Sequence, residues 1–292
     1  LAPQQAARGV LALVDLQVAG QPLPGPAGEA VPLSRVRLMA PVPVPRRNVW
    51  CVGRNYHAHA KELAGSVFKA NTQPAESWPI VFTKVPECVV GPQDEVVLPR
   101  GVSEQIDYES ELAVIIGRGG KNIRKEDAMA HVWGYTIVND VTARDVQMRH
   151  QQWDMGKSFD TFCPMGPWAV TADALDGTRT RVRGWVNGEL RQDAQTTDMI
   201  FDIPTLIETC SRGITLLPGD VIATGTQPTI RDLAARLNIS STNGVVCHLK
   251  ALHAKGLVDL TAVESRGISP AGFRDAVKSL AVRCQKGVAC AA

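Results

Sequence analysis

The chain lacks the features that would tie it to a membrane, a nucleic acid or an oxidising compartment. Its 292 residues contain no apolar stretch approaching the roughly 18–20 residues that a membrane helix needs. Its formal net charge is only +2, so neither nucleic acid nor an anionic membrane is indicated as a partner. The seven cysteines are an odd number without Cys-x-x-Cys spacing. This argues against a disulfide framework and favours a reducing, cytoplasmic location.

What is present is the composition of an ordinary globular protein, with 45% hydrophobic and 21% charged residues. The length suits one large domain with a small appendage. Residues 1–47 hold two strand-like runs, Val10–Leu16 and Val36–Met39, and end in the proline-rich stretch Pro41–Pro45, which favours an extended connector. We therefore expect a small N-terminal appendage over residues 1–47, in which no chemistry is visible.

Acidic side chains gather where two expected strands begin or end. Glu109 and Glu111 lie at the start of the apolar run Leu112–Ile116, and because side chains alternate along a strand, the two should face the same way. Asp140 follows a second expected strand at 134–138. Neighbouring carboxylates repel one another unless a cation lies between them, and oxygen ligands suit Mg²⁺, Mn²⁺ or Ca²⁺. The pattern alone also fits a polar edge of a half-buried strand.

A histidine and a glutamate, His59 and Glu62, lie three residues apart on an expected helical segment, Tyr56–Leu63, and so share a face. A carboxylate beside an imidazole fixes its tautomer and raises its basicity, as in a general base acting on water. An incidental pair on a surface helix is the alternative. Further along, Lys84 ends an expected strand, Ile80–Lys84, where it would either meet an anionic substrate or protect an edge strand from pairing.

Two more sites have the chemistry of anion binding. Lys157, between a glycine and a serine, is a candidate electrophile for an enolate or a carboxylate, because a lysine beside carboxylates stays charged. The expected strand end at Thr224–Thr226 offers backbone N–H groups and hydroxyls to a carboxylate. The rest of the pattern predicts a short helix at Ile123–Val132, a hairpin at Trp185–Leu190 and an amphipathic helix at Phe201–Cys210 with Pro204 in its first turn.

Taken together, five motifs in this order resemble the fumarylacetoacetate hydrolase family, and most closely its acylpyruvate hydrolases, oxaloacetate decarboxylases and dienedioate isomerase-decarboxylases. The resemblance spans residues 48–227, which we expect to form the catalytic domain. The motifs are Gly53-Arg-Asn-Tyr-x-x-His59-x-x-Glu62, Asp107-Tyr-Glu-x-Glu111-Leu, Gly134-Tyr-x-x-x-Asn-Asp140-Val-Thr-Ala-Arg-Asp, Gly156-Lys-Ser-Phe-Asp-Thr-Phe-Cys-Pro164 and Pro218-Gly-Asp-Val-Ile-Ala-Thr-Gly-Thr226.

The resemblance implies an α+β fold, a mixed β-sandwich roll with short helices, which is usually dimeric and holds one Mg²⁺ or Mn²⁺, or Ca²⁺ in some members. It places metal ligands at Glu109, Glu111 and Asp140. It also implies that His59 and Glu62 form a water-activating dyad and that Lys157 stabilises an enolate. Gln147 and Thr226 would bind the substrate. Arg54, Asn55 and Lys84 would lie close to the substrate.

The implied activity is metal-dependent cleavage of a C–C bond in a small 2-oxo acid. For an acylpyruvate, water activated by His59 and Glu62 attacks the distal carbonyl and leaves the enolate of pyruvate. For oxaloacetate, the same enolate forms by loss of CO₂ and needs no attacking water. Because the enolate is shared, hydrolase, decarboxylase and dienedioate isomerase remain alternatives.

The resemblance stops after Thr226. In place of the family's Pro-Ala-Gly-Val-Gly, this chain has Gln227-Pro-Thr-Ile, and residues 228–292 carry no family motif. A diverged extension and a reading-frame change both account for this. Open edge strands would follow if closing strands are missing, so a non-catalytic relative is the second hypothesis, although the His–Glu pair and Lys157 favour an enzyme.

Overall fold

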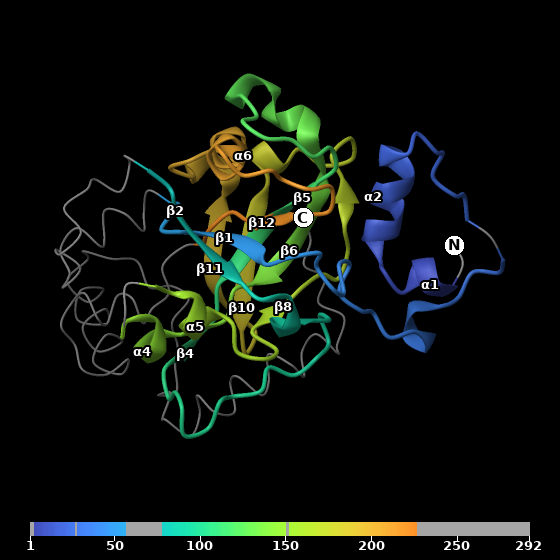
Figure 1. Cartoon of the computed structure of the whole chain (residues 1–292). Coiled ribbons are helices and arrows are strands. Elements are labelled where there is room, and N and C mark those ends of the chain that lie inside the picture. Colours follow the sequence, from blue (N-terminus) through green and yellow to red (C-terminus); the bar gives the residue numbers. More distant parts are fainter. Residues whose placement is uncertain (1–2, 27, 57–77, 150–151, 227–292) are drawn as a thin grey trace, which may run out of the picture.

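The computed structural model describes residues 3–26, 28–56, 78–149 and 152–226 (Figure 1). At its centre lies a six-stranded sheet with the strand order β2-β1-β12-β5-β6-β9. β1 and β12 pair in parallel and the other neighbours antiparallel, so the sheet is mixed. With a few short helices around it, the fold is α+β, as predicted. The strands are β1 (Val49–Gly53), β2 (Ile80–Lys84), β5 (Ser110–Ile116), β6 (Val132–Asn139), β9 (Val170–Thr171) and β12 (Val221–Ala223).

Both faces of this sheet are buried, which explains why β5 is a continuous apolar run rather than an alternating one. Leu112, Val114 and Ile116 belong to an apolar cluster with helix α6 (Ile203–Ser211). Ala113 and Ile115 point the other way and share a second cluster with helix α2 (Val10–Val18). The predicted strands at 80–84, 112–116 and 134–138 are confirmed as β2, β5 and β6.

Helix α6 confirms the amphipathic helix predicted at 201–210. Asp202 caps its N-terminus, where Oδ1 accepts a hydrogen bond from Thr205 N at 2.9 Å, and Pro204 lies in the first turn. Its buried residues recur at the spacing of one helix face. They are Ile203, Leu206, Ile207 and Cys210, with Ser211 at the end.

Smaller pairs of strands surround the central sheet. The predicted hairpin is formed by β10 (Arg181–Val186) and β11 (Glu189–Gln195). Its two turn residues, Asn187 (φ 54°) and Gly188 (φ 82°), both adopt the left-handed conformation that a tight hairpin turn requires. The other pairs are β3 (Val89–Val90) with β8 (Cys163–Pro164) and β4 (Ile106–Asp107) with β7 (Thr142–Ala143).

The remaining helices are short. The helix predicted at 123–132 is present as a 3₁₀ helix, Lys125–His131. The others are α1 (Pro3–Ala6), α4 (Arg144–Gln147), α5 (Asp154–Lys157) and the 3₁₀ turns Leu33–Arg35, Pro86–Cys88, Gly177–Arg179 and Thr196–Asp198. None of the helices in the described ranges is long and apolar enough to cross a membrane. Where the structure describes cysteines, at 51, 88, 163 and 210, they are free thiols.

The N-terminal strands were predicted wrongly. The run Val10–Leu16 lies within helix α2, and Val36–Met39 belongs to no strand. A short apolar run fits a strand and a buried helix equally well by periodicity, and the leucines and alanine of this run are strong helix formers. Leu11 and Val14 pack into the cluster on one face of the sheet, so tertiary packing selects the helix.

Candidate active site

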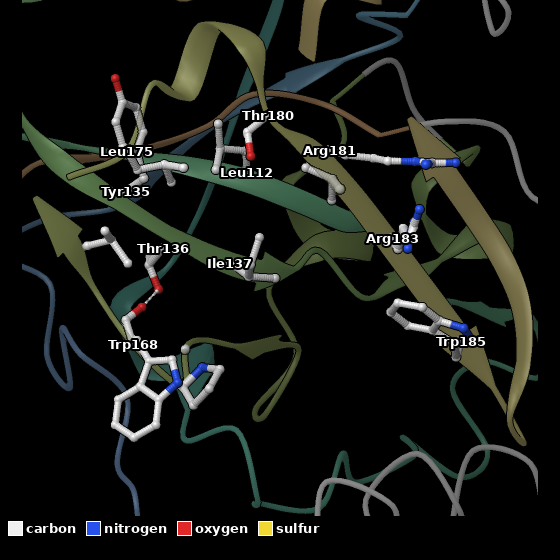
Figure 2. Close-up of a pocket in the computed structure, with 14 residues that line it drawn as sticks. Leu112, Tyr135, Thr136, Ile137, Trp168, Leu175, Thr180, Arg181, Arg183 and Trp185 are labelled. Atoms are coloured by element: carbon white, nitrogen blue, oxygen red, sulfur yellow. Dashed lines mark hydrogen bonds between the residues drawn. The ribbon is translucent and has the colours of Figure 1, made fainter. Parts of the chain in front are cut away.

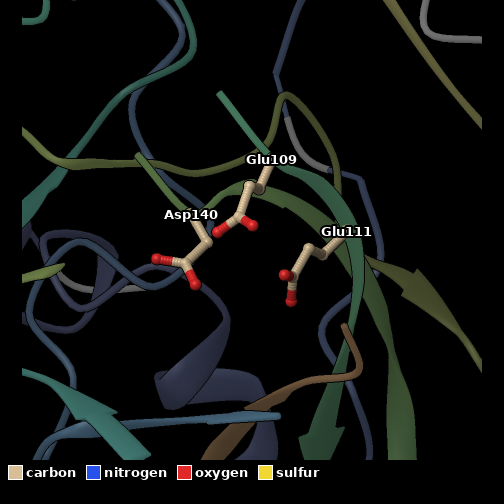
Figure 3. Close-up of side chains that lie close together, drawn as sticks. All are labelled: Glu109, Glu111 and Asp140. Carbon is tan, nitrogen blue, oxygen red and sulfur yellow. The ribbon is translucent and has the colours of Figure 1, made fainter. Parts of the chain in front are cut away.

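Three buried carboxylates converge at one end of the β5–β6 pair (Figure 3). Glu109, Glu111 and Asp140 each present an oxygen, and these oxygens all lie within 4.8 Å of one another. The strand register explains the meeting. Ser110 pairs with Asn139, so Glu109 lies opposite Asp140, whose N–H donates to the Glu109 carbonyl at 2.8 Å. The predicted common face of Glu109 and Glu111 does bring their carboxylates together.

Positive side chains balance two of these carboxylates. Lys157 Nζ donates to Glu109 and, at 2.6 Å, to Asp140 Oδ2. Arg144 Nη2 donates to Glu109 Oε1 at 2.8 Å. Burial alone would raise the pKa of Glu109, but the charges of Arg144 and Lys157 outweigh it and hold that pKa well below its usual range. For Lys157, burial alone would lower the pKa, but the charges of Asp140 and Glu109 more than offset this effect. The net pKa of Lys157 is therefore raised, and its side chain stays an ammonium group.

Among the described residues, Glu111 pairs with no such cation. Within the described part of the chain, its carboxylate accepts one hydrogen bond, from Gly225 N at 2.9 Å. Burial, followed by the charges of Asp140 and Glu109, raises its pKa well above the usual value. A divalent cation among the three carboxylates would remove this conflict, and an all-oxygen donor set suits Mg²⁺ or Mn²⁺. The side chains present therefore fit a divalent metal ion.

Close backbone packing brings Lys157 to this place. Lys157 ends helix α5, and Gly156 before it lies directly against helix α4, because a Cβ at Gly156 would be only 2.5 Å from Gln147 N. Any larger residue would push the two helices apart. The Lys157 ammonium also lies 4.7 Å from the ring centroid of Phe82, a distance that suits a cation–π contact. The predicted electrophile is thus held against the predicted metal ligands.

The residues predicted to bind substrate fall into two groups. The Asn55 amide is engaged by the protein: it donates to Phe201 O and Thr224 O and accepts from Phe201 N. The Thr226 hydroxyl donates to Ser110 O at 3.1 Å and accepts from Gln192. These contacts engage both side chains with the protein itself.

Gln147 and Arg54 are placed differently. Gln147 Oε1 accepts from Arg144 Nη1 at 3.1 Å, and its Nε2 group donates to no acceptor in the described ranges. Arg54 turns out of β1 with a positive φ of 56°, and its guanidinium lies 5.8 Å from the ring centroid of Trp153. His59 and Glu62 lie outside the described residues, so their predicted role stays a prediction.

Several side chains at the site were not singled out from the sequence. Arg144 donates to Asp107, Glu109 and Gln147, and Thr142 Oγ1 donates to Glu109 Oε2 at 2.9 Å. Both occur in the motif that follows Asp140, so their position close to a predicted metal ligand was the available signal. Gln192 on β11 had no such signal, because its partner Thr226 is 34 residues away.

A cavity lies on the face of β5 that carries Leu112 and is lined by none of the three carboxylates. Its volume is ≈ 80 Å³, and Figure 2 shows Ile137 of β6, Trp168 and Trp185 of β10 around it. Among the described site residues predicted from the sequence, none lines this cavity. Its walls are mostly apolar, without a cluster of groups suited to acid–base chemistry.

Comparison with known proteins assigns the fold. The family model described as fumarylacetoacetate (FAA) hydrolase C-terminal matches residues 48–260. The chain belongs to the fumarylacetoacetate hydrolase family. The match extends beyond residue 227, where the motifs recognised from the sequence end.

Curated relatives and solved structures of this family are similar over most of the chain. Oxaloacetate tautomerase YisK of Bacillus subtilis is 52% identical over 195 residues, which is 66% of this chain and 63% of YisK. Human mitochondrial oxaloacetate tautomerase FAHD2A is 47% identical over 201 residues, 68% of this chain and 61% of the relative. The chain thus spans about three fifths of the length of these relatives.

Among solved structures, a fumarylacetoacetate hydrolase from Exiguobacterium antarcticum is 43% identical, with a TM-score of 0.62 over 78% of each chain. A 2-hydroxyhepta-2,4-diene-1,7-dioate isomerase from Mycobacterium marinum is 39% identical, with a TM-score of 0.60 over 70% of this chain and 72% of the other. The relatives are enzymes of more than one reaction class, so the family does not by itself select hydrolysis.

Proposed function

We propose that this chain interconverts the keto and enol forms of a small 2-oxo acid, with oxaloacetate as the substrate and a divalent cation held by Glu109, Glu111 and Asp140. The observation that carries the proposal is the cluster of three buried carboxylates within 4.8 Å, two of which contact the Lys157 ammonium. The names of the relatives at 52% and 47% identity supply the substrate.

Tautomerisation breaks the C3–H bond of oxaloacetate, moves its electron pair into a C2–C3 double bond and leaves negative charge on the C2 oxygen. When bound, the cation supplies a Lewis acid for that oxygen. Lys157 remains an ammonium because of its acidic neighbours, so it can donate a hydrogen bond to the same oxygen as charge develops. The Gln147 Nε2 group faces no protein acceptor in the described ranges and can donate to a substrate carboxylate.

The proton itself needs a base, and the sequence offers His59 with Glu62. We assign to His59 the acceptance of the C3 proton, while Glu62 fixes its tautomer and stabilises the imidazolium. The C2 oxygen then takes a proton from solvent, and His59 returns its own to water. The assignment rests on the family motif and on the three-residue spacing of the pair.

The experiment is to supply oxaloacetate in its enol form and follow the loss of enol absorbance, with Mg²⁺, with Mn²⁺ and with EDTA. We expect acceleration that needs the metal, and that falls about 10²- to 10³-fold in Lys157→Met, the usual loss for a donor facing developing charge. His59→Ala should lose activity while still binding Mn²⁺. Folded protein that gives no metal-dependent acceleration would refute the proposal.

C–C bond cleavage is the second candidate. The solved fumarylacetoacetate hydrolase at 43% identity favours it, as does the His–Glu pair, since attack by water on a carbonyl needs such a base. Release of pyruvate from acetylpyruvate and from oxaloacetate, measured in the same reactions, separates the two. Acetylpyruvate cleavage that His59→Ala abolishes would make the protein a hydrolase. Pyruvate from oxaloacetate that survives His59→Ala would indicate decarboxylation, and turnover of neither substrate would favour a non-catalytic relative.

A further inference from the structure

Lys84, at the end of β2, has no exposed surface, although lysine is among the residues most rarely buried. Its ammonium group has three hydrogens and three protein acceptors. Nζ donates to Asp140 Oδ1 at 2.7 Å, to Val141 O at 3.1 Å and to the backbone carbonyl of Lys157. The hydrogen-bonding capacity of Lys84 is therefore used within the protein.

These acceptors belong to the two segments that carry the proposed chemistry. Asp140 and Val141 directly follow β6, while Lys157 ends helix α5. Lys84 thereby joins the backbone of α5 to the side chain of a candidate metal ligand. The Lys84 side chain therefore bonds both segments at once.

Asp140 is held from both sides as a result. Its Oδ1 faces the Lys84 ammonium and its Oδ2 faces the Lys157 ammonium at 2.6 Å. A carboxylate with one oxygen held in this way cannot rotate freely about χ2. An oxygen of Asp140 also lies within 4.8 Å of an oxygen of Glu109 and of Glu111, where a cation would bind (Figure 3).

The charge of Lys84 is maintained by its surroundings. Burial lowers its pKa, but Asp140 at 2.7 Å more than offsets this and the pKa is raised. Three buried cysteines, Cys163, Cys88 and Cys51, lie around it, and the Lys157 ammonium shares the Asp140 carboxylate with it. A buried ion pair of this kind contributes little net stability and is better suited to fixing geometry.

We propose that Lys84 is a positioning residue that holds Asp140 and Lys157 in one arrangement and makes no contact with the substrate. This role differs from the two expected from the sequence, in which Lys84 would meet an anionic substrate or protect an edge strand from pairing. The inference rests on the proposed function, in which Asp140 helps to hold a divalent cation. Partners that orient metal ligands typically change metal affinity or activity about 10- to 100-fold when they are removed.

The test uses Lys84→Met, which retains the length of the side chain and removes its charge and hydrogens. Mn²⁺ affinity, kcat, KM and the thermal unfolding midpoint are measured on the full chain. We expect Mn²⁺ to bind about tenfold or more weakly and kcat to fall, with KM for oxaloacetate nearly unchanged. A raised KM with unchanged kcat and Mn²⁺ affinity would indicate that Lys84 contacts the substrate, and would overturn the proposal. Unchanged KM, kcat and Mn²⁺ affinity would also overturn it.

Thr83→Val is the matched control. Thr83 Oγ1 donates to Asp154 Oδ1 at 2.7 Å, so it also links β2 to α5, but it does not touch Asp140. We expect this variant to bind Mn²⁺ as the unchanged protein does. Equal losses in Thr83→Val and Lys84→Met would mean that Lys84 merely supports the packing of α5, and would overturn the proposal.

Lys84→Arg retains the charge but cannot direct three hydrogens to the same three acceptors. It should lose Mn²⁺ affinity too, whereas full affinity and kcat would show that charge alone suffices and would refute a positioning role. If neither variant folds, ¹⁵N signals of the lysine ammonium groups test the unchanged protein. The Lys84 signal is identified as the buried lysine signal that remains in Lys157→Met. In the unchanged protein this signal should shift on addition of Mg²⁺ and not on addition of oxalate alone. The opposite response would overturn the proposal.

These readouts separate the two proposals. Loss of Mn²⁺ affinity in Lys84→Met, in a protein whose unchanged form does not tautomerise oxaloacetate, leaves the positioning role intact and rejects the reaction. Tautomerase activity that survives in Lys84→Met with unchanged Mn²⁺ affinity would support the proposed reaction and reject the positioning role of Lys84.

Discussion

The two ends of the β5–β6 pair show opposite uses of burial. At one end, Ile115 and Ile116 are fully buried among apolar side chains, where removal from water stabilises the fold. At the other end, Glu109, Glu111 and Asp140 are also buried, and there burial opposes the charged state. The first end holds the protein together, while the second is kept in place by Lys84, Lys157 and Arg144 and is where we propose that the chemistry takes place.

The comparison leads to a clear expectation. Substitutions at the apolar end should lower stability and leave the site chemistry intact in the folded fraction. Neutralising Glu111 at the acidic end should impair chemistry and leave the stability of metal-free protein unchanged or higher, because it relieves buried charge, whereas removing an ammonium group leaves buried carboxylates unpaired and should lower stability.

The largest effect is expected for Lys157→Met at the acidic end. Loss of its ammonium removes the donor to Glu109 and Asp140 and the proposed donor to the reacting oxygen, so turnover should fall about 10²- to 10³-fold. Enol absorbance with saturating Mg²⁺ measures this. Lys121→Met, at an exposed lysine in the turn after β5, is the control and should retain activity. Turnover within threefold of the unchanged protein would contradict the assigned role.

Ile115→Ala tests the apolar end. Its side chain is fully buried, so truncation leaves a cavity and should lower the free energy of unfolding by about 2–5 kcal/mol. Urea unfolding gives the value, and Mn²⁺ affinity measured well below the unfolding midpoint should be unchanged. Leu190→Ala, at a side chain that is 48% exposed on the hairpin, should change stability by no more than about 0.5 kcal/mol. A loss of Mn²⁺ affinity in Ile115→Ala would show that the two ends are coupled.

Glu111→Gln should reverse the usual sign of a substitution in a buried site. The pKa of Glu111 is raised in the folded protein, so its contribution to stability is present below the unfolded value of about 4.3 and is lost as pH rises through the folded pKa. Metal-free protein should therefore melt lower as pH rises, and this part of the pH dependence should disappear in Glu111→Gln. At neutral pH in EDTA, the variant should melt a few degrees higher.

Adding Mg²⁺ supplies the contrast within the same experiment. It should raise the melting midpoint of the unchanged protein by mass action and raise that of Glu111→Gln much less. Equal gains from Mg²⁺ in the two proteins would mean that Glu111 is no ligand.

The smallest effect is expected at the cap of helix α6. Asp202→Ala removes the acceptor for Thr205 N and should cost about 1 kcal/mol of stability without altering Mn²⁺ affinity or turnover. Asp202→Asn retains a capping oxygen and should lose less. Urea unfolding of the three proteins decides this, and a loss of turnover would show that α6 supports the site.

Much of the fold could be predicted because it follows local pattern. The apolar run of β5, the Asn187-Gly188 turn and the capped helix α6 each have a sequence signal contained within about ten residues. Helix α2 could not be predicted in this way, because its run of apolar residues fits either structure and contact with the sheet decides.

The sequence by itself determined which side chains belong to the candidate site: three carboxylates at strand ends and a lysine between glycine and serine. It also determined their order along the chain. It also indicated that Glu109 and Glu111 share a face, because strand alternation is a local property. Only the tertiary structure decided the pairing of these charges. The register that sets Glu109 opposite Asp140, the close approach at Gly156 and the three acceptors around Lys84 join segments distant in sequence. Which acceptor a buried ammonium meets depends on how those segments pack, and no local pattern carries that information.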